Sequence, residues 1–168
     1  KSVDLTLVVP PWNFPTAIPA GGVLAGLAAG SAVIFKPATI TARTGALIAE
    51  IMWDAGVPKE VLKLVKVVDR AAGKLLISHP EVDRLILTGG YETAELFRSW
   101  RDDLPLFGET SGKNSIIVTP NADIDLAVKD VVYSAFGHAG QKCSAGSTVI
   151  LVGSVAQSER FRRQLIDS

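Results

Sequence analysis

The sequence contains a single cysteine, Cys143, and no cluster of charge of one sign. One cysteine cannot form an internal disulfide, which is typical of a reducing compartment and leaves Cys143 as either an inert small hydrophobe or a reactive thiol. Lysine plus arginine and aspartate plus glutamate balance at 17 each, and basic residues do not gather with interleaved aromatics. This excludes the electrostatic footprint of a nucleic-acid or anionic-membrane surface, so we expect a small-molecule or protein partner.

A secretory signal peptide is not visible, and we expect a cytoplasmic protein. The stretch from Pro10 to Phe35 lacks charge, and Gly22, Gly26 and Gly30 repeat at the spacing that lets membrane helices pack closely. Two prolines interrupt this run, however, and it passes into β-branched residues. The pattern therefore favours a small-residue helix packed against a sheet over a membrane span.

The 168 residues, of which 48% are hydrophobic, suffice for one domain with a real core or for one large piece of a bigger protein. The chain starts at Lys1 and enters a strand-like run almost at once. We therefore expect a segment of a longer protein, so that part of its chemistry depends on residues outside the chain.

Short apolar runs alternate with helical stretches, which is typical of βαβ units with a parallel sheet. Strands are expected at 5–9, 32–35, 62–67, 84–88 and 105–107, and helices at 41–55, 70–78 and 92–101. After Gly112 a strand at 114–118, a helix at 126–136, the cysteine loop and a strand at 147–152 follow. We predict an α/β fold with a Rossmann-like parallel sheet flanked by helices in residues 1–110, and a second lobe in residues 111–168.

Two motifs at strand ends suit a nucleotide cofactor. Gly89-Gly90 follows a strand and precedes a helix, which presents backbone N–H groups and the positive end of a helix dipole to a phosphate. The Gly-x-Gly-x-x-Gly fingerprint is absent, so a plain tight turn is the alternative. Lys36 follows another strand, and Pro37 keeps the exit extended. Lys36 and Thr39 can donate to ribose or phosphate, although a solvated lysine is the alternative.

Two polar residues stand out by their surroundings. Asn13 lies in a stiff frame of aromatics and prolines, where its neutral amide can stabilise an oxyanion or cap the helix that begins near Thr16. Glu109 follows an apolar strand and is expected to be half-buried, a setting that raises the pKa of a carboxyl and suits a general base. An ion pair with Lys113 is the alternative.

Cys143 lies among Gly, Ala and Ser, where a thiol is accessible and where Lys142 and the backbone N–H groups of the loop favour the thiolate. His138, five residues earlier, raises the alternative of a Cys–His hydrolase pair. A buried, inert cysteine and a helix-end histidine also stay open on these residues alone.

Together, five motifs resemble those of the aldehyde dehydrogenase superfamily, and they occur in the same order: PWNFP, FKPA, LTGGYETA, ETSGKN and GQKCSA. The longer stretches FGETSGKNSIIV and SAFGHAGQKCSA are similar to the pyrroline-5-carboxylate dehydrogenase branch, which oxidises glutamate γ-semialdehyde in proline breakdown. In bacteria this branch is often fused to a flavin-dependent proline dehydrogenase, so FAD would belong to a domain outside this chain. The resemblance implies that residues 111–168 begin the catalytic lobe, and that the parent is a homo-oligomer, peripheral at the inner membrane if fused.

The resemblance also implies a role for each motif. Cys143 attacks the aldehyde, and the Asn13 amide with the Cys143 backbone N–H holds the oxyanion of the thiohemiacetal. Hydride passes to NAD, and Glu109 then activates the water that hydrolyses the thioester to glutamate. Ser144 helps to orient the substrate. The cofactor-binding residues are Lys36, Thr39, Gly89 and Gly90, and no metal is involved.

Thr39 stands where many members carry a carboxylate for the adenosine ribose, so NADP stays open beside NAD. Two further alternatives are another NAD(P)-dependent aldehyde dehydrogenase and a segment that binds a nucleotide without catalysing a reaction.

Overall fold

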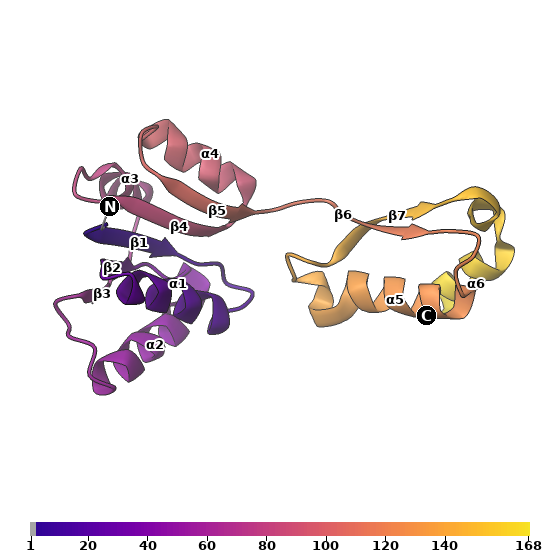
Figure 1. The fold of residues 1–168 in the computed structure, drawn as a ribbon, viewed down its shortest axis with the longest axis horizontal. Helices are drawn as coiled ribbons and strands as arrows, with labels where there is room; N and C mark the ends of the chain where they lie inside the picture. The colour runs from indigo at the N-terminus through magenta and orange to yellow at the C-terminus, as the bar shows by residue number, and fades with distance from the viewer. Residues whose placement is uncertain (1–2) are drawn as a thin grey trace. The chain divides into compact units, whose positions relative to one another are not determined.

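The computed structural model describes residues 3–168, which form two compact units, one up to Ser111 and the other from Gly112 onward (Figure 1). The first unit contains β1 (Leu5–Val9), α1 (Ala17–Ala28), β2 (Ala32–Phe35), the 3-10 helix η1 (Thr39–Thr41), α2 (Ala42–Asp54), β3 (Leu62–Leu64), α3 (Arg70–Ser78), β4 (Arg84–Gly89), α4 (Tyr91–Trp100) and β5 (Leu106–Thr110).

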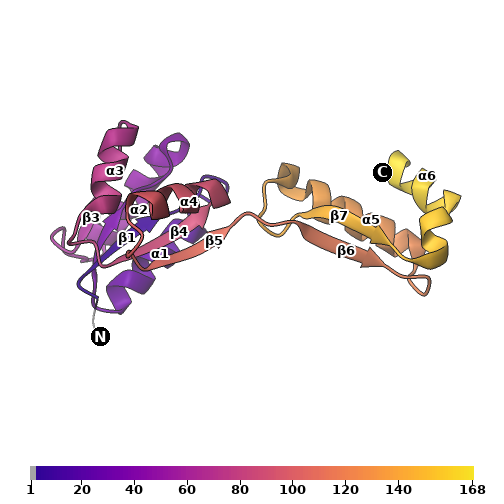
Figure 2. The same cartoon turned by 90° about the horizontal axis from the view of Figure 1, so that it is seen from above.

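The five strands of the first unit form one parallel sheet in the order β3-β2-β1-β4-β5. Successive side chains of a strand point to opposite faces, so Leu7 and Val9 pack with α3 and α4 while Val8 packs with α1 and α2. Helices therefore cover both faces (Figure 2). The predicted α/β fold with a helix-flanked parallel sheet is correct.

The chain passes outward from β1 to β2 and β3, and then returns to place β4 and β5 on the other side of β1. The topological switch point therefore lies between β1 and β4. All strands are parallel, so their carboxyl ends share one border of the sheet, which we call the carboxyl edge. In open α/β sheets, ligands bind at this edge beside the switch point.

Helix α1 packs directly on the sheet because glycines face it. A Cβ atom at Gly22 would lie 2.9 Å from Cγ1 of Val8, and one at Gly26 would lie 2.8 Å from Cγ2 of Val33. Gly22 and Gly26 thus serve helix–sheet packing, as predicted, whereas Gly30 lies after the end of α1 and has a positive φ of 80°. Within residues 3–168, no helix is both long and apolar enough to cross a membrane.

Strand β5 differs from the sequence-based expectation. The strand was expected to end at residue 107, but pairing of Thr88 with Glu109 and of Gly89 with Thr110 extends it to Thr110. Glu109 thus lies within the strand and not after it. Strand β3, in contrast, is shorter than expected and ends at Leu64.

The second unit contains β6 (Asn114–Val118), α5 (Ile124–Phe136), the 3-10 helix η2 (Gly137–Gly140), β7 (Gly146–Leu151), the 3-10 helix η3 (Gly153–Gln157) and α6 (Glu159–Asp167). Strands β6 and β7 pair in parallel, over a core of Val118, Val128, Val155 and Phe161. Helix α5 begins earlier than expected because the Asp123 carboxylate caps the N–H of Leu126.

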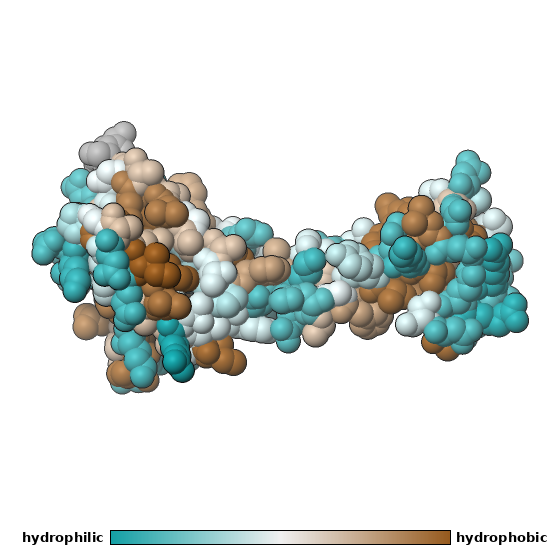
Figure 3. Space-filling model, turned by 90° about the horizontal axis from the view of Figure 1, so that it is seen from below, coloured by the Kyte–Doolittle hydropathy of each residue, from teal (hydrophilic) through white to brown (hydrophobic). Residues whose placement is uncertain are grey.

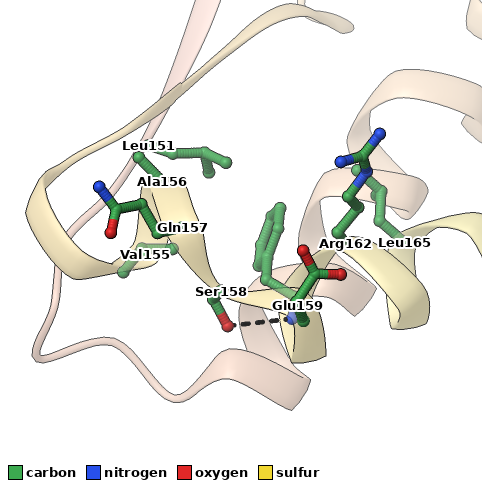
Figure 4. A pocket seen from close by; sticks show the side chains of 9 residues that line it. Leu151, Val155, Ala156, Gln157, Ser158, Glu159, Arg162 and Leu165 are labelled. Atoms are coloured by element: carbon green, nitrogen blue, oxygen red, sulfur yellow. Dashed lines mark hydrogen bonds between the residues drawn. The ribbon is translucent and has the colours of Figure 1, made fainter.

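A pocket of about 310 Å³ opens between η3 and α6 (Figure 4). The Ser158 hydroxyl accepts a hydrogen bond from the N–H of Phe161 and caps α6 at this point. Four of the lining side chains are aliphatic: Leu151, Val155, Ala156 and Leu165. The pocket contains none of the residues that the sequence motifs single out.

Candidate active site

The carboxyl edge of the sheet brings together motifs that are distant in sequence. Lys36 directly follows β2, Asn13 lies in the loop after β1, and Gly90 directly follows β4. Because β1 lies between β2 and β4, the three loops leave adjacent strand ends on either side of the switch point. This is where the topology predicts a ligand.

Lys36 is fixed by its backbone and partly removed from water. Its N–H donates to the Val8 carbonyl at 2.9 Å, which continues the pairing of β2 with β1. Pro37, which follows, is buried against α2, where a Cβ at Gly45 would lie 2.6 Å from the Pro37 Cβ. Burial lowers the pKa of the Lys36 ammonium. Lys36 is therefore not a fully solvated lysine.

The Gly89-Gly90 turn leads into the N-terminus of α4. Gly90 occupies the N-cap position with φ −73° and ψ 147°, and as a glycine it has no side chain that could cap the helix. Neither glycine has a positive φ, so the turn does not require glycine for its backbone. The first N–H of the helix, that of Tyr91, donates to the Ser111 hydroxyl at 3.1 Å. Sequence reasoning missed Ser111, which occupies a donor that a phosphate would otherwise use.

A small cleft of about 140 Å³ marks the switch point on the α1 side of the sheet. The residues that line it come from the ends of β1 and β4 and from the first turns of α1: Val8, Val9, Pro10, Ile18, Gly22, Ile86 and Thr88. It begins where the Asn13 loop leaves β1. Most of the residues that line the cleft are apolar, and Thr88 is the one with a hydroxyl group.

Asn13 is half-buried, and the N-cap position of α1 belongs to Thr16. Thr39 is exposed and begins η1, shortly after Lys36. Its hydroxyl is therefore accessible near the end of β2.

Glu109 is exposed in this chain, which differs from the half-buried setting expected from the sequence. The reason is topological, because β5 is the last strand on one side of the sheet and pairs only with β4. Its carboxylate faces solvent, and its register with Thr88 places it close to the carboxyl edge.

In the second unit, Cys143 is exposed, so the interpretation as a buried filler is wrong. The N–H of Ala145 donates to the carbonyl of Lys142 at 3.1 Å. This closes a β-turn over 142–145 with Cys143 at its second position and Ser144 at its third. We call residues 142–145 the cysteine turn. The Lys142 ammonium lies 5.9 Å from the centre of the Tyr133 ring.

The backbone before the cysteine turn adopts an uncommon conformation. His138 and Ala139 have φ of 56° and 55°, in the left-handed region, and Gly140 follows with φ 69°. Non-glycine residues in this region cost about 1–3 kcal/mol each and cluster at functional sites. His138 is exposed.

The motif assignments gave no role to Asn114, which contacts the cysteine turn. Its side-chain amide donates to the carbonyl of Cys143 at 2.6 Å and to the carbonyl of Ala145 at 3.0 Å. The signal was present in the sequence, because Asn114 ends the same motif that begins with Glu109.

The chain thus combines a doubly wound parallel sheet, which has a lysine and a helix N-terminus at its carboxyl edge, with an exposed cysteine in a tight turn of the second unit. This is an α/β fold with a candidate ligand site and an accessible thiol. The sequence model of the aldehyde dehydrogenase family matches residues 3–168. The chain belongs to this family.

Among curated proteins, the chain is 36% identical over 157 residues to 1-pyrroline-5-carboxylate dehydrogenase 1 of Halalkalibacterium halodurans, covering 89% of this chain and 30% of that protein. Among solved structures, Proline Utilization A of Corynebacterium freiburgense superposes with a TM-score of 0.91 at 54% identity, covering 99% of this chain and 17% of the other. The chain thus spans about a third or less of the length of these relatives.

Three more solved structures share the fold. A mutant of Thermus thermophilus 1-pyrroline-5-carboxylate dehydrogenase has a TM-score of 0.91 at 34% identity, with 99% of this chain and 33% of the other covered. A Staphylococcus aureus betaine aldehyde dehydrogenase in complex with NAD+ has a TM-score of 0.92 at 31% identity, with 99% of this chain and 33% of the other covered. An NADP-dependent glyceraldehyde-3-phosphate dehydrogenase from Bacillus halodurans complexed with NADP has a TM-score of 0.92 at 30% identity, with 99% of this chain and 35% of the other covered.

Proposed function

We propose that the full-length protein oxidises L-glutamate γ-semialdehyde, the open form of 1-pyrroline-5-carboxylate, to L-glutamate in proline catabolism, with NAD as the acceptor. One observation carries the proposal: all five motifs occur in order on one chain whose relatives are named 1-pyrroline-5-carboxylate dehydrogenases at 36–37% identity. The similarity to Proline Utilization A extends to 54% identity. This supports a parent in which a flavin-dependent proline dehydrogenase, with its FAD, is fused outside this chain.

The residues at the carboxyl edge fit a dinucleotide. A partly desolvated ammonium at Lys36 and a hydroxyl at Thr39 are donors for ribose and phosphate, and the helix dipole at the N-terminus of α4 favours an anion beside Gly90. A phosphate that uses the first N–H of α4 would displace the Ser111 hydroxyl from it. NAD, when bound, supplies the hydride acceptor. Thr39 carries no charge to repel a 2′-phosphate, so the site also accommodates NADP.

The chemistry proposed for the chain's own residues starts at the exposed thiol of Cys143. Its thiolate attacks the aldehyde carbon, and the side-chain amide of Asn13 and the backbone N–H of Cys143 donate to the resulting oxyanion. After oxidation leaves a thioester on Cys143, Glu109 takes a proton from water, and the hydroxide displaces the thiolate to release glutamate. Ser144, at the third position of the cysteine turn, orients the substrate.

The test is a pair of variants in the full-length protein. Cys143→Ala is expected to abolish oxidation of glutamate γ-semialdehyde, followed as formation of reduced cofactor, and to leave NAD binding nearly intact. His138→Ala is the matched loop variant and keeps its activity, because only a Cys–His hydrolase needs that imidazole. Substantial turnover by Cys143→Ala would refute the mechanism, and activity of the wild type on another aldehyde alone would refute the assigned substrate.

A further inference from the structure

The cysteine turn depends on contacts from outside itself. It is closed by only one internal bond, from the Ala145 N–H to the Lys142 carbonyl. The residues before it, His138 and Ala139, lie in the left-handed region, and the Gln141 N–H donates to the His138 carbonyl at 3.0 Å. A turn with so few internal bonds keeps one conformation only when its surroundings hold it there.

Asn114 supplies such contacts. The amide has two N–H donors, and the structure uses both on the turn, at 2.6 Å to the Cys143 carbonyl and 3.0 Å to the Ala145 carbonyl. The Cys143 carbonyl belongs to the central peptide of the turn, whose orientation distinguishes type I from type II turns. Ser144 has no positive φ, so the turn is of the type I class, and the bond from Asn114 holds its central peptide in that orientation.

Asn114 is itself held by the sheet of the second unit. It begins β6 and pairs with Gly146 of β7, beside a bulge between Asn114 and Ser115. The Gly146 N–H donates to the Ser134 hydroxyl of α5 at 3.1 Å, and a Cβ on Gly146 would lie 2.8 Å from Cδ1 of Ile116. The Asn114 amide therefore holds the exposed cysteine turn in a fixed place relative to β6, β7 and α5.

We propose that Asn114 is the positioning residue of the nucleophile: its amide holds the cysteine turn in the one conformation that displays Sγ and directs the Cys143 N–H outward. The Lys142 carbonyl points into the turn to accept from Ala145, and a planar trans peptide places the Cys143 N–H on the opposite side. The catalytic meaning of this arrangement rests on the proposed function, in which that N–H binds the oxyanion.

The experiment uses the full-length protein and two substitutions, Asn114→Asp and Asn114→Ala. Aspartate keeps the shape of asparagine but has no N–H to donate. Asn121 is exposed in the same unit, so Asn121→Asp and Asn121→Ala are matched controls. We expect the single-turnover rate of cofactor reduction to fall about 10- to 100-fold in the Asn114 variants, since a small misplacement of a reacting group costs this much. The KM for aldehyde and the affinity for NAD stay unchanged, as does every parameter of the controls.

A rate close to that of the wild type in both Asn114 variants would overturn the proposal. A parallel loss of NAD affinity and melting temperature would also overturn it, because general damage to the fold would then explain the lower rate.

A second measurement separates this proposal from the proposed function. The rate at which iodoacetamide alkylates Cys143, without substrate or cofactor, is expected to change at least about threefold in the Asn114 variants and to stay the same in the Asn121 controls. The reason is that the reactivity of a thiol depends on the groups around it. If that change occurs while the wild type oxidises no aldehyde, the function fails and the positioning role stands. If the wild type oxidises the aldehyde while alkylation is the same in all variants, the positioning role fails and the function stands.

Discussion

Lys36 illustrates how a place at the end of a strand changes the chemistry of a single residue. Its ammonium is half-buried and its pKa is lowered by desolvation, while its backbone is fixed by the bond to Val8. A partly desolvated cation gains more from an anionic or hydroxyl-rich ligand than a solvated one. The sequence indicated the place of the residue, but only packing decides how much water it loses.

We predict that Lys36→Met raises the KM for NAD about 10- to 100-fold in the full-length protein, because a hydrogen bond from a charged group contributes about 1.5–3 kcal/mol. The turnover number at saturating NAD falls less. Lys63→Met is the matched control, since Lys63 is exposed on β3 of the same sheet, and its KM for NAD stays as in the wild type. Steady-state kinetics with varied NAD provides the measurement, and equal KM values for the two variants would contradict the role of Lys36.

The same residue predicts a pH dependence. Binding requires the charged ammonium, so the KM for NAD rises as the pH increases through the pKa of Lys36. Burial lowers that pKa, so the rise begins at a lower pH than for an ordinary lysine. Lys36→Arg, which stays charged throughout, is expected to flatten this limb of the profile. A wild-type KM that stays constant throughout the alkaline range would exclude a titrating Lys36.

Residues at exposed or capping positions were the hardest to foresee. The exposure of Glu109, the Ser111 hydroxyl on the first N–H of α4 and the Asn114 amide on the cysteine turn each depend on a neighbour that is distant in sequence. Motif spacing identified Lys36, Gly90 and Cys143 because their chemistry is local to a strand end or a loop. Their proposed roles in catalysis and cofactor binding stay predictions.

At the scale of elements, glycines set how closely helices approach the sheet. Gly45 of α2 faces the Pro37 ring, and a Cβ there would lie 2.6 Å from Cβ and 2.7 Å from Cγ of that ring. A proline ring cannot rotate away as a flexible side chain does. Helix α2 is therefore placed against the segment that carries Lys36 by the absence of a side chain at Gly45.

We predict that Gly45→Ala lowers the free energy of unfolding by about 1–3 kcal/mol, although alanine is the better helix former, because overpacking displaces the Pro37 ring. Gly21→Ala in α1 is the control, because nothing lies within 4 Å of a Cβ at that position. It should raise stability by about 0.5–1 kcal/mol. Thermal or denaturant unfolding measures both, and stabilisation by Gly45→Ala would contradict the close packing.

Most elements were predictable because hydrophobic periodicity and helix-stop signals are local. Helix α2 was expected at 41–55 and occurs at Ala42–Asp54, and it ends before Gly56 with φ 101°. The length of β5 was not predictable in this way. Its last residues, Glu109 and Thr110, are polar and become a strand only because Thr88 and Gly89 pair with them.

At the scale of the whole molecule, the chain consists of two units, and the motif residues are divided between them. Asn13, Lys36, Gly90 and Glu109 belong to the first unit, and Cys143 belongs to the second. Apolar surface is exposed on both units (Figure 3). Among the large hydrophobic residues that are exposed are Ile40, Leu75, Ile117, Tyr133 and Phe136. Exposure on this scale is typical of surfaces that contact other parts of a protein.

We predict that the 168-residue chain by itself binds NAD but does not oxidise glutamate γ-semialdehyde, whereas the full-length protein does both. The physical reason is that the chain spans only 30% of a curated relative and exposes large apolar side chains on both units, which we expect other parts of the full-length protein to cover. Reduced cofactor is followed by absorbance at saturating substrate, and NAD binding by calorimetry. Turnover by the isolated chain at a rate close to that of the full-length protein would contradict this prediction.

The sequence by itself determined the order of strands and helices, the parallel sheet and the family, because periodicity, breakers and motif strings are encoded within short windows. The tertiary structure alone decided that the β1–β4 switch point adjoins the loops of Asn13, Lys36 and Gly90. It also decided that β5 lies at the border and leaves Glu109 in solvent, and that Asn114 reaches the cysteine turn. Each of these depends on the pairing of strands and packing of side chains that lie far apart in the chain, and no local window contains both partners.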